Sequence, residues 1–80
     1  MTKEQIFEKL DVIVKSINPD SAIHENTALI TESILDSLEF MNYVTKVEES
    51  FNISLSDSDI SNQKLGIIGN MINYLIQKIQ

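Results

Sequence analysis

The chain has 80 residues, 42% of them hydrophobic, which is enough for one small domain spanning 1–80 and too apolar for a disordered segment. It has no cysteine and one histidine, which excludes disulfides and thiolate zinc sites, and we expect no metal site. Six basic and twelve acidic residues give a net charge of −6, which disfavours nucleic acid and anionic membrane as partners. Since there is neither a hydrophobic run of transmembrane length nor a signal-peptide pattern, we expect a soluble, cytoplasmic monomer.

The first predicted helix ends before Asn18-Pro19, because proline pushes the preceding residue out of the α-helical region. Thr2 is its predicted N-cap, and Gln5 has the spacing of the second residue of a capping box. Its apolar residues recur on one helical face: Ile6, Leu10, Ile13, Val14 and Ile17.

A long connection without a clear period follows, at residues 18–36. We expect a packed, irregular loop with one short helical turn, because its apolar residues are too many for a free loop. These residues are predicted to attach the segment to the rest of the domain: Ile23, Leu29, Ile30, Ile34 and Leu35.

The second helix is predicted to run from Ser37 or Leu38 to Phe51. Its core face has helical spacing and consists of Phe40, Tyr43, Val44, Val47 and Phe51. Leu38 and Met41 lie off the centre of this face. They are either peripheral core residues or an apolar surface patch that a partner touches.

Two further helices complete the predicted fold. Ser56 and Asp59 have capping-box spacing at the start of a short third helix, and the fourth covers about 67–79. The buried row of the fourth helix is predicted to be Ile68, Ile72, Leu75 and Ile79, flanked by Met71 and Ile76. We therefore expect an all-α four-helix bundle, with three longer helices, a short helix III and a long loop between helices I and II.

Metal binding and catalysis find little support in the sequence. The segment from Asp57 begins like a calcium-binding EF-hand loop, but Asn62 and Ile68 replace the glycine and the glutamate that such a loop needs. A serine hydrolase would require His24 to reach Ser37 from a loop, without a glycine-rich turn around the serine. We therefore expect no catalytic residues, and a protein that is not an enzyme.

Ser37 stands where the acidic loop meets the second helix, and it is either a helix cap or a site of modification. A phosphate ester would be favoured there by the helix dipole and opposed by Asp36 and Glu39. Those two carboxylates are easier to explain if they bind a metal ion or a basic patch on an incoming enzyme. The acidic surroundings indicate a basic protein partner, or simply a solvated acidic face.

The segment Leu35-Asp36-Ser37-Leu38, followed at the right distance by Val47-Glu48-Glu49-Ser50-Phe51, resembles the acyl carrier protein family, and the similarity covers most of the chain. The resemblance implies a 4′-phosphopantetheine arm on Ser37, attached from coenzyme A by a phosphopantetheinyl transferase. The thiol of the arm would hold an acyl or aminoacyl group as a thioester. A loading ligase or transferase and downstream synthase enzymes are the other implied partners. Expected recognition residues are Asp36, Leu38, Glu39, Met41, Glu48 and Glu49.

Two features depart from the family pattern. Typical members have a glycine shortly before the Asp-Ser-Leu triplet, where this chain reads Glu32-Ser33-Ile34-Leu35. Helix II of fatty-acid carriers is usually densely acidic, whereas this one has Asn42, Thr45 and Lys46 among its polar positions. We therefore expect a carrier for a polyketide, a peptide or a dedicated acyl transfer rather than for general fatty acid synthesis. The alternative is an unmodified acidic helical interaction module.

Overall fold

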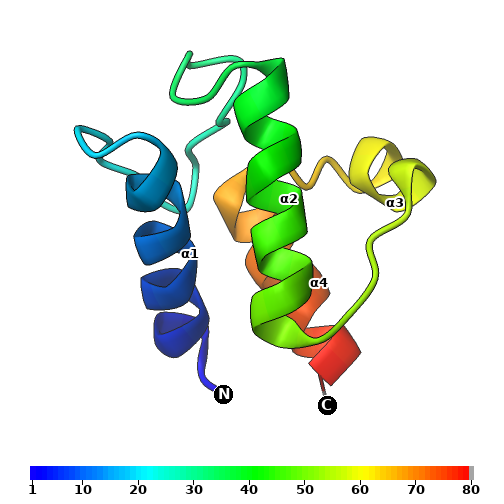
Figure 1. Ribbon diagram of the computed structural model, residues 1–80. Helices are drawn as coiled ribbons and strands as arrows, with labels where there is room; N and C mark the ends of the chain where they lie inside the picture. The colour runs from blue at the N-terminus through cyan, green and yellow to red at the C-terminus, as the bar shows by residue number, and fades with distance from the viewer. Residues whose placement is uncertain (80) are drawn as a thin grey trace.

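The computed structural model describes residues 1–79, which form four helices: α1 (Lys3–Ile17), α2 (Ser37–Phe51), α3 (Asp57–Asn62) and α4 (Ile68–Ile79). In Figure 1, α1 and α2 stand side by side, α4 lies behind them, and the short α3 sits on the outer flank of α2. The contacts of α1 are with both α2 and α4. The predicted all-α bundle with one short helix is confirmed. No helix within residues 1–79 has the length and apolar character needed to cross a membrane.

The helix ends are stabilised mostly as the sequence predicts. The Thr2 hydroxyl accepts the Gln5 backbone N–H at 3.1 Å, and the Gln5 side-chain oxygen accepts the Thr2 N–H at 2.8 Å, which completes the predicted capping box. Ser56 caps α3 by accepting the Asp59 N–H at 3.0 Å. The Asp59 carboxylate does not complete a second box, because it binds Tyr74 instead.

The core is built from the predicted helical faces. Ile17 and Ile79, at the ends of their rows, are only partly buried. Tyr74 is a core residue that the predicted row of α4 does not include. The buried residues of the three longer helices are Ile6, Leu10, Ile13 and Val14 in α1, Phe40, Tyr43, Val44, Val47 and Phe51 in α2, and Ile68, Met71, Ile72, Tyr74 and Leu75 in α4.

The long connection between α1 and α2 is a packed element. Ile23, Leu29 and Leu35 are buried, and Ile34 is partly buried. The Leu29 carbonyl accepts the N–H groups of both Ile34 and Leu35, at 2.9 and 3.0 Å. An isolated antiparallel bridge pairs Ala28 with Ile67 just before α4. The prediction of a packed loop holds for these residues, but it is wrong for Ile30, whose side chain is 47% exposed.

The two tyrosines of the core differ in whether the hydroxyl group has a hydrogen-bond partner. The Tyr74 hydroxyl donates to Asp59 Oδ2 at 2.8 Å and so ties α3, which has no buried residue, to α4. The Tyr43 hydroxyl is fully buried and has no hydrogen-bond partner within residues 1–79. Burial raises the pKa of Tyr43, since ionisation would place a charge in the apolar core.

Removing each tyrosine hydroxyl should therefore change stability in opposite directions. We expect Tyr74→Phe to lower the free energy of unfolding by about 1–3 kcal/mol, because it deletes a hydrogen bond to a carboxylate. Tyr43→Phe removes a buried polar group that lacks a partner, and it should raise the free energy of unfolding by about 1 kcal/mol or leave it unchanged. Urea unfolding of the two variants measures this. A larger loss for Tyr43→Phe than for Tyr74→Phe would contradict the assignment.

Candidate functional site

The first turn of α2 is closed by a capping box between Asp36 and Glu39. Asp36 Oδ1 accepts the Glu39 backbone N–H at 2.8 Å, and Glu39 Oε1 accepts the Asp36 N–H at 2.9 Å. Asp36 is the N-cap and Ser37 is the first helical residue. The interpretation of Ser37 as the cap is therefore wrong, because the neighbouring carboxylate already satisfies the backbone donor that a cap serves.

The Ser37 side chain is exposed, and its hydroxyl makes no hydrogen bond within residues 1–79. It stands in the first turn of a helix of 15 residues, at the positive end of the helix dipole. The hydroxyl is thus free to react or to be esterified without loss of an existing contact. The carboxylates of Asp36 and Glu39 have a structural function in the capping box, so their presence needs no external ligand to explain it.

The segment that leads into α2 is held by a contact from α1 and contains a left-handed turn. Asn18, at the end of α1, donates from its side-chain nitrogen to the Ile34 carbonyl at 2.9 Å. Ser33 has a φ of 60°, in the left-handed region that favours glycine. The chain therefore retains the turn for which a glycine would be suited, but makes it with a serine.

Exposed apolar side chains occur near Ser37. Leu38 and Met41 are 83% and 51% exposed, which places them on the surface rather than in the peripheral core. Ile30, which sequence reasoning placed in the packed loop, joins Ser37 in lining a hollow of about 270 Å³. Its neighbour Leu29 is fully buried.

The acidic residues of α2 are less available than the sequence indicates. Glu48 is half-buried, and its Oε2 accepts the Leu55 N–H at 2.8 Å, which fixes the link between α2 and α3. Glu49 is exposed and makes no hydrogen bond within the described residues. Of the four predicted recognition carboxylates, Glu49 alone is without such a contact. The role of all six predicted residues in partner recognition stays a prediction.

His24 lies far from Ser37. It lines a hollow beside the N-terminal half of α1, together with Phe7 and Glu8. Ser37 instead follows the segment that contacts Asn18 at the opposite end of α1, a helix about 22 Å long. This arrangement gives Ser37 no histidine base, and no group of three or more metal-ligating side chains occurs within residues 1–79.

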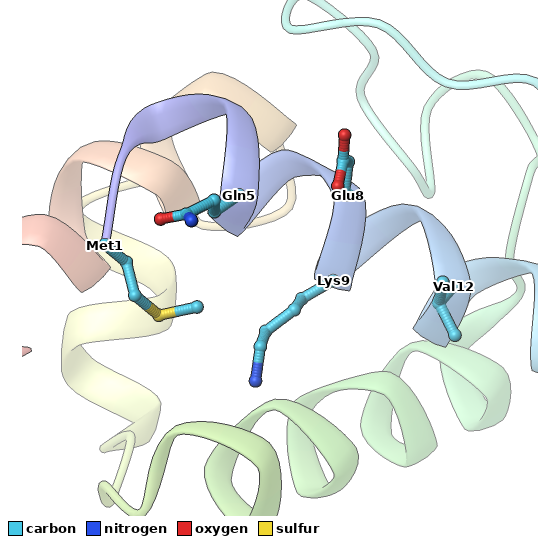
Figure 2. A pocket seen from close by; sticks show the side chains of 5 residues that line it. All are labelled: Met1, Gln5, Glu8, Lys9 and Val12. Atoms are coloured by element: carbon cyan, nitrogen blue, oxygen red, sulfur yellow. The ribbon is translucent and has the colours of Figure 1, made fainter.

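Figure 2 shows another hollow, of about 450 Å³, on the face of α1 that carries Gln5, Lys9 and Val12. The Lys9 ammonium lies 5.5 Å from the centre of the Phe51 ring, at the C-terminal end of α2. Since α2 is about 22 Å long, this hollow is remote from Ser37. Its lining residues offer no activated nucleophile.

Comparison with known proteins finds relatives named acyl carrier protein over nearly the whole chain. The relative from Exiguobacterium sp. is 31% identical over 87 aligned positions, which cover 99% of this chain and 100% of the relative. The relative from Thermotoga maritima is 28% identical over 80 residues, covering 98% and 96% of the two chains. The relative from Chlamydia caviae is 31% identical over 65 residues, covering 80% and 82%. No family model matches the chain, and no solved structure gives a significant match.

The strained turn before α2 yields a stability prediction. Ser33→Gly should raise the free energy of unfolding by about 0.5–1 kcal/mol, because glycine adopts positive φ without the steric cost that a side chain imposes. Ser54→Gly is the matched control, since Ser54 is also exposed in a loop but is not among the residues with positive φ. Ser54→Gly should lower the free energy of unfolding, because glycine gives the unfolded chain greater conformational freedom. Equal changes in both variants, measured by urea unfolding, would rule out strain at Ser33.

Proposed function

The chain belongs to the acyl carrier protein family, and we propose that it carries an acyl or aminoacyl group on a 4′-phosphopantetheine arm attached to Ser37. Members of this family carry intermediates for partner enzymes and are not enzymes themselves. When bound, the arm supplies the thiol that the chain lacks, since it contains no cysteine, and the cargo is held there as a thioester. We propose that residues 1–80 do this as a single domain.

The observation that carries this proposal is the free hydroxyl of Ser37. A transferase must bring this oxygen to a phosphorus atom of coenzyme A, form the new P–O bond and release adenosine 3′,5′-bisphosphate. An exposed side chain in the first helical turn, with no hydrogen bond to break, suits that attack. The resulting phosphodiester would stand at the positive end of α2, which offsets part of the repulsion from Asp36.

The recognition surface supports a specialised carrier rather than one for general fatty acid synthesis. Asp36, Glu39 and Glu48 are engaged in intramolecular hydrogen bonds, and Lys46 is exposed on the same helix as Glu49. Three of the four predicted recognition carboxylates are thus held in one orientation by an internal bond, and the fourth shares its helix with an exposed lysine, unlike the densely acidic helix II of a fatty-acid carrier. We propose that the partners are a phosphopantetheinyl transferase, a dedicated loading ligase or transferase, and downstream synthase enzymes.

Mass spectrometry after incubation with coenzyme A, magnesium and a broad-specificity phosphopantetheinyl transferase tests the function. We expect the mass to rise by one phosphopantetheine in the wild type and in Ser50→Ala, a control at another exposed serine of α2. Ser37→Ala should gain nothing. A wild type that stays at its sequence mass would favour the unmodified interaction module, and a gain that persists in Ser37→Ala would place the arm elsewhere.

Exposure of Leu38 predicts that it acts in recognition rather than in stability. Leu38→Ala should change the free energy of unfolding by less than about 0.5 kcal/mol, because its side chain is 83% exposed. The rate of modification should nevertheless fall several-fold, and we expect the same pattern for Met41→Ala. Val12→Ala is the control, since Val12 is 68% exposed on α1 and should change neither quantity. A stability loss of several kcal/mol would show that Leu38 belongs to the core.

A further inference from the structure

We propose that the arm on Ser37, when no partner is bound, lies on this chain in a channel that runs from Ser37 across Ile30 to the link between α3 and α4. The channel consists of two neighbouring hollows. This inference rests on the proposed function, because it needs the arm to be attached to Ser37.

The two hollows adjoin at one residue. The first is the hollow of about 270 Å³ in whose wall Ser37 stands. The second, of about 230 Å³, lies between residues 28–31 and the residues Lys64, Gly66 and Ile67. Ile30 lines both. Each hollow alone is smaller than the roughly 300 Å³ at which small-molecule pockets begin, so a ligand of this class would have to extend through both.

The walls of the channel match the chemistry of the arm. Pantetheine carries two amide groups, whose carbonyls accept hydrogen bonds, and a pair of methyl groups on one carbon. The backbone N–H groups of Ile30, Thr31 and Gly66 donate to no acceptor within residues 1–79. The half-exposed Ile30 side chain supplies apolar surface where the two hollows meet. The channel therefore offers both the donors and the apolar contact that the arm needs.

The channel is held open by the fold itself. Leu29, which is fully buried, donates its N–H to the Gly66 carbonyl at 2.9 Å, and this bond ties the loop to the α3–α4 link. Glu32 Oε2 accepts the Ala28 N–H at 2.8 Å, which fixes the turn of the loop between these two residues. Binding of the arm would not have to order these segments first.

Attachment to Ser37 favours this channel over the other hollows. A covalent tether raises the effective concentration of the arm at nearby surfaces to about the millimolar range, so weak contacts suffice there. The hollow in Figure 2 and the hollow beside His24 do not include Ser37 and lie by the N-terminal half of α1. The hollow that Ser37 itself lines, and its neighbour across Ile30, lie nearest the attachment point and so benefit most from the tether.

Nuclear magnetic resonance of the ¹⁵N-labelled protein before and after modification tests the channel, with mass spectrometry on the same sample. We expect the amide signals of Ile30, Thr31, Gly66 and Ile67 to shift on modification, and contacts to appear between the arm's methyl groups and the Ile30 side chain. Ile30→Glu should abolish the shifts at Gly66 and Ile67 while the mass gain persists. Val12→Glu, a matched substitution at an exposed residue outside the channel, should leave the shifts intact.

The outcomes separate the channel from the function. A complete mass gain with shifts confined to the neighbours of Ser37, and no contacts to Ile30, would overturn the channel and leave the carrier function in place. Shifts at Gly66 that survive Ile30→Glu would also overturn it. Absence of the mass gain would remove the carrier function, and the channel with it.

Discussion

The reciprocal hydrogen bonds between Asp36 and Glu39 determine what Ser37 can do. The first turn of any helix leaves backbone donors without partners, and a serine beside that turn is normally used to satisfy one of them. Here the two carboxylates satisfy the N–H groups of both capping-box residues, at 2.8 and 2.9 Å. The serine therefore stays in a rigid helical turn while its hydroxyl remains unbound. A reactive side chain on a fixed element is easier for an enzyme to position than one on a mobile loop.

The position of this capping box depends in turn on the irregular segment before it. Leu29 and Leu35 are buried, and the Leu29 carbonyl binds the two N–H groups that immediately precede Asp36. Asn18 links the end of α1 to the same segment through Ile34. The start of α2 is thus attached to α1 and, through the bond from Leu29 to Gly66, to the start of α4. A loop without regular structure thereby connects the site to both neighbouring helices.

Helical periodicity made most of the fold predictable. The rows of α1, α2 and α4 were predictable because one face of each helix is apolar at a spacing that only a helix satisfies. The sequence did not predict which of Asp36 and Ser37 is the cap, because the two residues are adjacent and both residue types cap helices well. Tyr74 donates a hydrogen bond to Asp59 of α3, and this contact between residues 15 positions apart cannot be read from a local pattern. Ile30 is similar: its exposure follows from the path of a loop that has no period.

The same contacts change the meaning of the acidic composition. A net charge of −6 suggests a strongly acidic docking surface, yet Asp36, Glu39 and Glu48 each stabilise a turn of this chain. An ionised carboxylate has two accepting oxygens, and each of these residues uses one of them internally, so the internal bond fixes the direction in which the charge is presented. The side chains of Leu38 and Met41, in the first two turns of α2, are also exposed, and they are apolar. Apolar contact is short-range, so it contributes only once two surfaces already touch, whereas charge also acts at a distance.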